Sequence, residues 1–288
     1  MKDMTSMNDT FYIIGGGPSF LDVTEDEWKF LENKNTIQFA RVPYGSRKPK
    51  YYLSIEHVEA DKSVLSYMAK LRWFDVRLLL YNYESLKYAK KLGFKYIKKI
   101  NKGNFYFMPS RRPWFVDDDP PCSYYTTRAK SFRQPLFRFR GQLNAVVNAC
   151  LILGAKEIRL IGIDMNDQYN FYVRDDYKHL NELCKDEYTI QEFKEYMNSK
   201  YATERLKSKN QFNPNWNPEK MHTTNMPYCE YDKYGDKKMV GMEDLLSWED
   251  DEIRKEGMRG IFTTSKNSIL YKHNKLEYRG IRDGTCEE

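Results

Sequence analysis

The chain has 288 residues, of which 41% are hydrophobic and 31% are charged, and this composition excludes a wholly disordered chain. The 47 Lys and Arg residues exceed the 41 Asp and Glu residues, which gives a formal net charge of +6. An excess of this size permits an anionic partner, such as a nucleotide, a nucleic acid or a lipid surface, but does not require one.

The apolar segments and the cysteines give information about the compartment. No hydrophobic segment reaches the length of a membrane span, and the N-terminus lacks an apolar signal core, so we expect no transmembrane segment. The cysteines are odd in number and show no C-x-x-C spacing: Cys122, Cys150, Cys184, Cys229 and Cys286. This usage indicates reduced thiols in a cytoplasm rather than a disulfide framework or a zinc site.

The first predicted strand, Phe11–Ile14, runs directly into Gly15, Gly16, Gly17, Pro18 and Ser19. We expect this glycine turn to expose backbone N–H groups and to let a ligand approach the main chain, and a phosphate would suit that geometry best. The turn is neither the dinucleotide fingerprint G-x-G-x-x-G nor a Walker loop, because no Gly-Lys-Ser/Thr follows. A tight turn without a ligand is the structural alternative.

Strands and helices then alternate through the first half of the chain. Thr24 and Glu27 form a capping-box signature that predicts a short helix through about Leu31. Hydrophobic spacing predicts further strands at 36–39, 51–55 and 76–80, and helices at 59–71 and 83–92, the last ended by Gly93.

The clearest helix–strand unit lies further along the chain. Gln142 to Leu153 has helical apolar spacing and is followed by Gly154, and an apolar strand over 157–164 ends in Gly162 and Asp164. Near-continuous apolar strands between amphipathic helices predict a mostly parallel α/β sheet with both faces covered. Ligands bind beyond the carboxyl ends of such strands, where we expect the glycine turn and Asp164 to meet.

Two irregular regions interrupt this pattern. Residues 100–140 are aromatic, basic and proline-bearing, and residues 165–235 are polar, with a helix expected near 189–207. We interpret both as insertions around the site, with the second acting as a lid. A helix at about 243–255 and a strand at 260–264 complete a single α/β domain over residues 1–288.

Several motifs together resemble one superfamily, which includes bacterial lipooligosaccharide sialyltransferases and 6-hydroxymethylpterin diphosphokinase-like proteins. The resembling segments are Gly15–Ser19, Pro49–Glu56, Gly141–Asp164 and Thr264–Ser268. The resemblance implies a Rossmann-like fold, meaning a mostly parallel sheet flanked by helices, with a polar lid insertion. It covers the nucleotide-binding half of such a protein and little of the acceptor half.

The resemblance also implies roles for individual residues in binding a nucleotide. The implied nucleotide-binding residues are Gly15, Gly16, Gly17, Ser19, Gly141, Gly162 and Tyr172, with Asp164 lining the same site. Gly16, Glu56, Arg140 and Asn166 depart from the residues that the sialyltransferases carry. These departures argue against a sialic-acid donor but are compatible with another nucleotide-bound donor.

Sugar transfer needs a stabilised leaving phosphate and a base that takes a proton from the acceptor hydroxyl. Arg140 and Tyr172 are candidates for the phosphate, although Arg140 is equally compatible with a surface ion pair. His222 is the first candidate base, with His57 second among the histidines and an ordinary surface role as the alternative. The carboxylates of Glu56 and Asp164 are further candidates for the catalytic base.

A basic and aromatic segment offers a second kind of binding surface. Arg111, Arg112, Trp114 and Arg140 could contact a nucleic-acid backbone and base or an anionic glycan, or form a solvated loop. The acidic run 117–119 has the composition of a metal clamp, but its proline-flanked setting favours a solvated loop, so no metal site is assigned.

The sequence therefore predicts a cytoplasmic glycosyltransferase that moves a sugar from a nucleotide-sugar to a hydroxyl of a glycan or of a modified base in DNA. The Lys-, Tyr- and Asn-rich composition has a viral character, and a viral protein would act in the host cytoplasm. One alternative is a pterin-type diphosphokinase that uses ATP and Mg²⁺, and another is a non-catalytic nucleic-acid-binding module. No cofactor is firmly implied, and the oligomeric state stays open.

Overall fold

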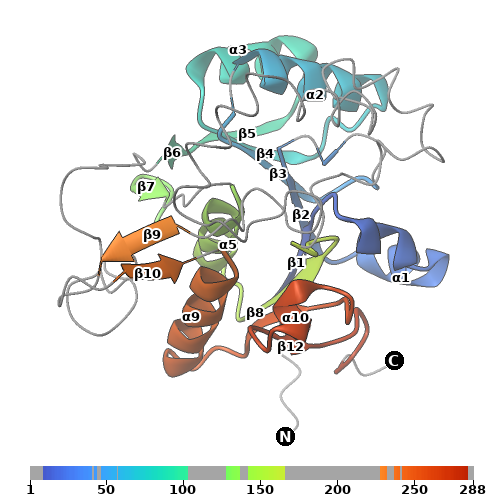
Figure 1. Ribbon diagram of the computed structural model, residues 1–288. Coiled ribbons are helices and arrows are strands. Elements are labelled where there is room, and N and C mark those ends of the chain that lie inside the picture. Colours follow the sequence, from blue (N-terminus) through green and yellow to red (C-terminus); the bar gives the residue numbers. More distant parts are fainter. Residues whose placement is uncertain are drawn as a thin grey trace, which may run out of the picture.

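The computed structural model describes residues 9–40, 42–43, 47–56, 58–102, 128–136, 142–165, 228–231, 237–240 and 242–284. Its centre is a parallel eight-stranded sheet with the order β12-β11-β8-β1-β2-β3-β4-β5 (Figure 1). Helices lie on both faces of this sheet. The expected Rossmann-like α/β fold is confirmed.

The first half of the chain builds one side of the sheet by stepping outward from β1. The elements are β1 (Thr10–Ile14), the 3₁₀ helix η1 (Pro18–Asp22), α1 (Glu25–Leu31), β2 (Asn35–Phe39), β3 (Tyr51–Ser54), α2 (Val58–Lys70), β4 (Arg77–Leu80), α3 (Tyr83–Leu92) and β5 (Tyr96–Lys99). Each strand from β2 to β5 pairs in parallel with the strand before it.

The second half of the chain adds strands on the side of β1 opposite to β2. Its elements in the main domain are α5 (Leu143–Ile152), β8 (Glu157–Ile161), α9 (Met242–Lys255), β11 (Gly260–Thr263), α10 (Ile269–Lys272) and β12 (Glu277–Tyr278). Two small pairs complete the described elements: parallel β6 (Asn101–Lys102) with β7 (Pro135–Leu136), and antiparallel β9 (Tyr228–Tyr231) with β10 (Lys237–Val240).

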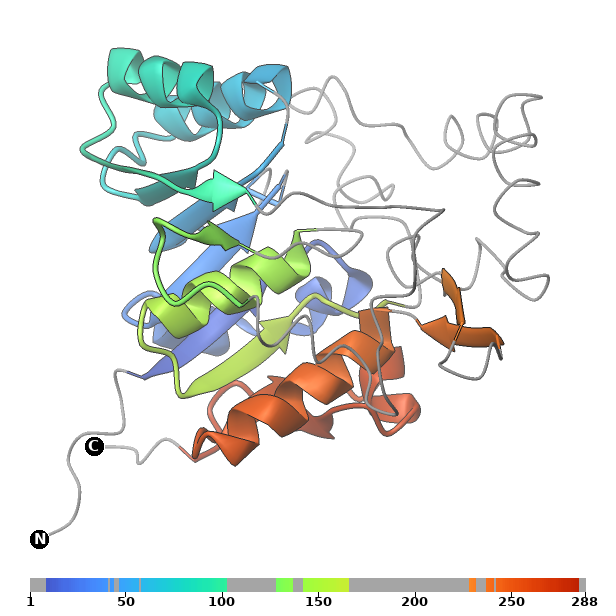
Figure 2. The ribbon, with the colours of Figure 1, turned by 90° about the vertical axis from the view of Figure 1, so that its left-hand side faces the viewer.

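The two faces of the sheet are buried by different helices, which explains the unbroken apolar character of the strands. Along β1, Phe11 and Ile13 pack on the side of α5 and α9, whereas Tyr12 and Ile14 pack on the side of α1, α2 and α3. This alternation follows from the two-residue period of a strand. Figure 2 shows α5 and α9 on one side of the strands, which point toward a common edge.

Local capping explains where several helices begin and end. The Thr24 side chain accepts from the Glu27 N–H while the Glu27 carboxylate accepts from the Thr24 N–H, so the predicted capping box is confirmed. Gly93 and Gly154 follow α3 and α5 with left-handed φ values of 94° and 97°. Both glycines therefore end helices as the sequence predicts.

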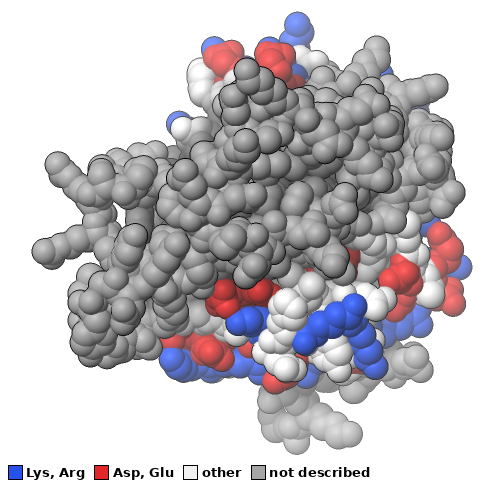
Figure 3. All heavy atoms as spheres, in the orientation of Figure 1, with Lys and Arg blue, Asp and Glu red and all other residues white. Residues whose placement is uncertain are grey.

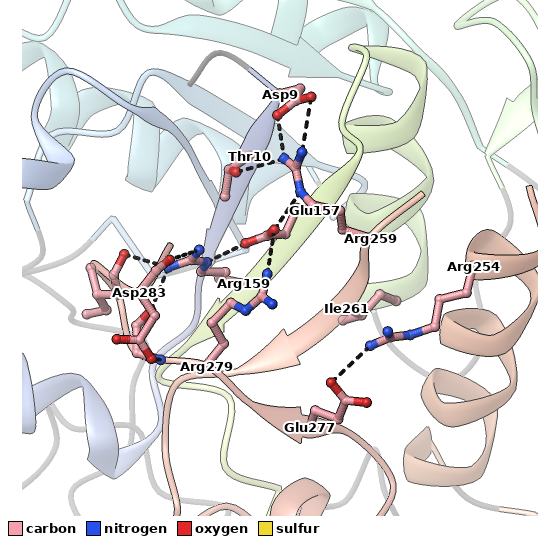
Figure 4. Close-up of polar contacts among 12 residues, drawn as sticks. Asp9, Thr10, Glu157, Arg159, Arg254, Arg259, Ile261, Glu277, Arg279 and Asp283 are labelled. Carbon is pink, nitrogen blue, oxygen red and sulfur yellow. Dashed lines mark hydrogen bonds and ion pairs between the residues drawn. The ribbon is translucent and has the colours of Figure 1, made fainter. Parts of the chain in front are cut away.

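At the amino ends of the strands, a buried carboxylate joins distant segments of the chain (Figure 4). Glu157 accepts hydrogen bonds from Arg159, Arg259 and Arg279, each over 2.7–2.8 Å. Arg159 also donates to the backbone carbonyls of Ile281 and Asp283, over 2.8 and 2.6 Å. These contacts fasten β11 and the segment after β12 to β8.

Sequence reasoning missed several short elements, including η1, β5, α10 and β12. Strand β5 begins only two residues after Phe94 and has a mixed pattern of Tyr, Ile and Lys, so it lacks the apolar run that identified its neighbours. None of the helices in the described ranges is both long enough and apolar enough to cross a bilayer.

Candidate functional site

The sheet reverses its direction of growth between β1 and β8. From β1 the chain continues to β2 on one side, whereas β8 pairs with the other side of β1 and continues to β11. Such a switch point opens a crevice beyond the carboxyl ends of the two strands, where open α/β sheets bind their ligands. The glycine turn follows β1 and the Gly162–Asp164 segment follows β8, so both predicted features lie at this switch point.

The two loops touch through their glycines. Ile14 pairs with Ile161 in the sheet register, and the N–H groups of Gly15 and Gly17 donate to the carbonyls of Ile161 and Gly162, both over 2.7 Å. A Cβ on Gly162 would lie 2.6 Å from the Gly15 carbonyl oxygen, and Gly162 has a left-handed φ of 63°. Glycine is therefore required at 162 by both space and backbone conformation.

This contact corrects part of the expectation for the glycine turn. The N–H groups of Gly15 and Gly17 were expected to be exposed to a phosphate, but both are used in the β1–β8 junction. The glycines permit close packing between two loops of the protein. Phosphate binding by these two N–H groups is therefore not what the geometry supports.

Asp164 lies directly under the glycine turn. Its Oδ2 accepts from the Ser19 N–H over 2.8 Å, and a Cβ on Gly17 would lie 2.7 Å from the same oxygen. Asp164 is 3% exposed and Ser19 is 8% exposed. Asp164 Oδ1 and Ser19 Oγ are both buried without a hydrogen-bond partner among the residues that the structure describes.

Two buried polar atoms without partners are costly unless something else satisfies them. Leaving such an atom unsatisfied costs about 1–3 kcal/mol. Unsatisfied polar groups in a folded protein therefore call for an explanation, and a ligand is one. Asp164 Oδ1 is an acceptor when ionised and Ser19 Oγ is both donor and acceptor, so together they suit a ligand that carries hydroxyl or amino groups.

The electrostatic environment of Asp164 matches this interpretation. Burial raises the pKa of its carboxyl above the ordinary value, and the N–H and side chain of Ser19 and the side chain of Ser265, which lie close to the carboxyl, offset this only in part. Asp22 adds a repulsive negative charge. A titratable group with a shifted pKa in a ligand-binding crevice is a common mark of a functional site.

The closing turn of the sheet holds Asp164 from the other side. The Ser268 hydroxyl contacts the carbonyls of Ile163 and Asp164 over 3.2 and 3.1 Å, and the Ile269 N–H donates to the Asp164 carbonyl over 3.0 Å. Ser268 also caps α10. The backbone after Asp164 turns sharply, because Met165 has a left-handed φ of 62°. The Asp164 backbone is therefore fixed on both sides of the residue.

Comparison with known proteins identifies no relative with this arrangement. The chain matches no protein-family model, no curated protein and no solved structure. The site is therefore interpreted from its geometry and from the motif resemblance alone.

Glu56 lies on the same edge of the sheet, just beyond β3 and two strands from β1. At the usual strand spacing this corresponds to about 10 Å between β1 and β3. Gln142, which precedes α5, donates from Nε2 to Glu56 Oε1. The structure thus places Glu56 and Asp164 on one edge, where Gly15, Gly16, Gly17, Ser19 and Gly162 also lie.

Other predicted site residues lie outside the described residues. They are His57, Arg111, Arg112, Trp114, Arg140, Gly141, Tyr172 and His222, together with the acidic run 117–119, Asn166 and most of the expected lid 165–235. Their roles stay predictions.

Charge in the described part of the chain gives no single-sign surface on the face in Figure 3, where acidic and basic side chains lie beside one another. The ion pairs of the described ranges include Arg47 with Glu25 and Lys275 with Asp244. Within the described ranges, no group of three or more His, Cys, Asp or Glu side chains is placed to hold a metal ion.

Sequence reasoning missed Gln142 and the role of Ser268. Gln142 was assigned only as the start of a helix, and no local pattern signals that its amide reaches a strand end 86 positions earlier. Ser268 belongs to the segment Thr264–Ser268, which the motif resemblance included. The resemblance therefore marked this residue, but it did not indicate that its hydroxyl holds the backbone at Asp164.

Proposed function

We propose that this protein is a glycosyltransferase whose nucleotide-sugar donor binds at the β1–β8 switch point. The observation that carries the proposal is the pair of buried, unpartnered atoms Asp164 Oδ1 and Ser19 Oγ beside the glycine turn. The motif resemblance, which spans the same residues, supports a nucleotide as the ligand.

In this proposal the switch point holds the nucleoside part of the donor. A ribose or base presents hydroxyl and amino groups, which can donate to Asp164 Oδ1 and exchange a hydrogen bond with Ser19 Oγ. A phosphate presents only acceptors and negative charge, and it would be repelled by the ionised Asp164 carboxylate. The diphosphate or phosphate of the donor is therefore expected away from Asp164.

The acceptor is proposed to be a hydroxyl group on a glycan or on a modified base in DNA. The reaction joins the acceptor oxygen to the anomeric carbon of the sugar while the bond from that carbon to the phosphate oxygen breaks. The acceptor proton passes to a base, and the nucleotide leaves as an anion. No metal is assigned to this reaction.

The proposal is tested by incubating the purified protein with nucleotide-sugars of the CMP, UDP and GDP classes and measuring the released nucleotide. Glycans and hydroxymethylated DNA are supplied in turn as acceptors. Wild-type protein should release nucleotide from one donor class, and Asp164→Asn should lower the rate by about tenfold or more. The matched control is Asp250→Asn, because Asp250 is a buried aspartate of α9 that also accepts from a backbone N–H, that of Ile261 in β11.

Two results would contradict the proposal. One is the absence of nucleotide release with every donor and acceptor. The other is an equal loss of rate in Asp164→Asn and Asp250→Asn, which would show that the effect is structural. AMP release from ATP, dependent on Mg²⁺ and a pterin alcohol, would instead identify a diphosphokinase.

A further inference from the structure

Glu56 is held at the edge of the sheet by two separate sets of contacts, one to its carboxylate and one to its backbone. Gln142 Nε2 donates to Glu56 Oε1, and Gln142 Oε1 accepts from the Ile55 N–H over 3.3 Å. A single amide side chain therefore fixes both the carboxylate of residue 56 and the backbone just before it. Gln142 is only 5% exposed, so its own position is fixed by the surrounding core.

A buried relay holds the Glu56 backbone from below. The Glu56 N–H donates to Ser54 Oγ over 3.2 Å, and Ser54 Oγ in turn donates to Asp61 Oδ1. The second oxygen of Asp61 accepts from Ser85 Oγ over 2.6 Å. Ser54, Asp61 and Ser85 are all fully buried, and they connect the end of β3 to α2 and α3.

Both carboxylate oxygens of Asp61 accept hydrogen bonds in this relay. In the Glu56 carboxylate, by contrast, only Oε1 accepts a hydrogen bond from a described residue. Within the described part of the chain, Glu56 Oε2 makes no hydrogen bond or ion pair. The donor on Oε1 is a neutral amide rather than a Lys or Arg side chain. Glu56 is thus a half-buried carboxylate of fixed position whose second oxygen is not used by any residue that the structure describes.

Asp164 differs from Glu56 in its burial and in the donor that its carboxylate accepts from. It is almost fully buried beneath the glycine turn, and its Oδ2 is occupied by the Ser19 N–H. It is therefore placed to hold the nucleoside. Glu56 follows β3, three strands from β8, which is about 14 Å along the same edge by strand spacing. A nucleotide and its attached sugar can bridge this separation.

We propose that Glu56 is the catalytic base that takes the proton from the acceptor hydroxyl, and that Gln142 is its positioning residue. This inference rests on the proposed glycosyl transfer. In the reaction, Glu56 Oε2 takes the proton as the hydroxyl oxygen bonds to the anomeric carbon, and the electron pair of the broken carbon–oxygen bond leaves with the nucleotide phosphate. A base held in position contributes about 10²–10⁴-fold to such a step.

The test uses Glu56→Gln, Gln142→Leu and Gln142→Glu in the full-length protein, with the donor and acceptor that wild type turns over. Glu56→Gln should lower kcat by about 10²-fold or more while the affinity for the free nucleotide stays within about threefold. Glu59→Gln is the matched control, because Glu59 is an exposed carboxylate three residues away that pairs with Lys62. Its kcat should equal that of wild type.

The Gln142 variants separate positioning from folding. Gln142→Leu should lower kcat by about tenfold with unchanged nucleotide affinity. Gln142→Glu places a second carboxylate beside Glu56, which favours the protonated form of the pair. The acid limb of its kcat profile should therefore move to higher pH, a change that a loss of packing would not produce.

The outcomes distinguish this inference from the proposed function. If wild type turns over and Glu56→Gln retains kcat within about threefold, the base assignment is overturned and the glycosyltransferase proposal stands. If Gln142→Glu shows an unmoved acid limb, the positioning role is overturned. If wild type turns over no donor, the proposed function fails and the base assignment fails with it.

Discussion

The N–H of Ser19 donates to the carboxylate of Asp164 over 2.8 Å, between residues 145 positions apart in the sequence. This hydrogen bond joins the loop after β1 to the loop after β8, at the point where the sheet reverses its direction of growth. It uses one oxygen of Asp164 and the backbone of Ser19. The other Asp164 oxygen and the Ser19 hydroxyl are buried and make no hydrogen bond with the described residues, and we propose that a ligand uses them.

Ser19→Ala should therefore separate ligand binding from stability. The buried Ser19 hydroxyl makes no hydrogen bond with the described residues, so its removal should leave the free energy of unfolding unchanged or raise it, by up to about 1–3 kcal/mol. The affinity for the nucleotide should fall by roughly 3–10-fold, since a hydrogen bond contributes about 0.5–1.5 kcal/mol. Denaturant unfolding and calorimetric titration measure the two quantities.

Ser268→Ala is the matched control for that substitution. The Ser268 hydroxyl contacts the carbonyls of Ile163 and Asp164 and caps α10, so its loss should destabilise the fold by about 1–2 kcal/mol. If Ser19→Ala destabilised the protein as much as Ser268→Ala, the Ser19 hydroxyl would have a structural role instead.

Asp164→Asn should change how stability depends on pH. Burial raises the pKa of the Asp164 carboxyl above its ordinary value of 3.8, because the folded state favours the protonated form. The stability that comes from this protonated carboxyl is therefore complete below pH 3.8 and is lost as the pH rises through the folded-state pKa. Asparagine does not ionise, so the variant should not lose this stability as the pH rises. At pH 7 it should be more stable than wild type by about 0.5–2 kcal/mol. Urea unfolding between pH 3 and pH 7 measures the difference, and a variant that was equally destabilised throughout would contradict the assignment.

Glu157→Gln should show the opposite pH dependence. Burial alone would raise the pKa of Glu157, but Arg159, Arg259 and Arg279 bring it below its ordinary value of 4.5. The stability from this carboxylate is therefore present above that pH and is lost as the pH falls through the folded-state pKa. Removing the charge should cost about 3 kcal/mol at pH 7, with a smaller difference in acid. Unfolding curves of both proteins at pH 4 and pH 7 test this, and a cost that grew in acid would count against it.

Gly162→Ala should be more damaging than Gly93→Ala, although both glycines have a positive φ. A Cβ at 162 would meet the Gly15 carbonyl, whereas a Cβ at Gly93 would meet nothing within 4 Å. Gly93→Ala should cost only about 1 kcal/mol of backbone strain. Gly162→Ala should cost clearly more, and it should also weaken nucleotide binding. Equal thermal midpoints for the two variants would show that the loops can separate freely.

The sequence predicted most of the parallel sheet because its central strands are buried on both faces and read as short apolar runs between helical patterns. It also predicted that Gly15 and Asp164 would lie together, since both follow central strands at their carboxyl ends. It could not predict that the N–H groups of Gly15 and Gly17 are used by β8, because a glycine allows close approach of a ligand or of the protein's own backbone equally. The contact of Gln142 with Glu56 depends on tertiary packing between a helix end and a strand end, which leaves no periodic signal in the chain.

The central claim is that Asp164 and Ser19 bind a nucleotide at the switch point. The most direct measurement is calorimetric titration of wild type, Asp164→Asn and Asp250→Asn with CMP, UDP, GDP and ATP, each with and without Mg²⁺. Wild type and Asp250→Asn should bind one of CMP, UDP or GDP, and Asp164→Asn should bind it about tenfold more weakly. Failure of wild type to bind any of these nucleotides, or equal affinity in Asp164→Asn, would contradict it.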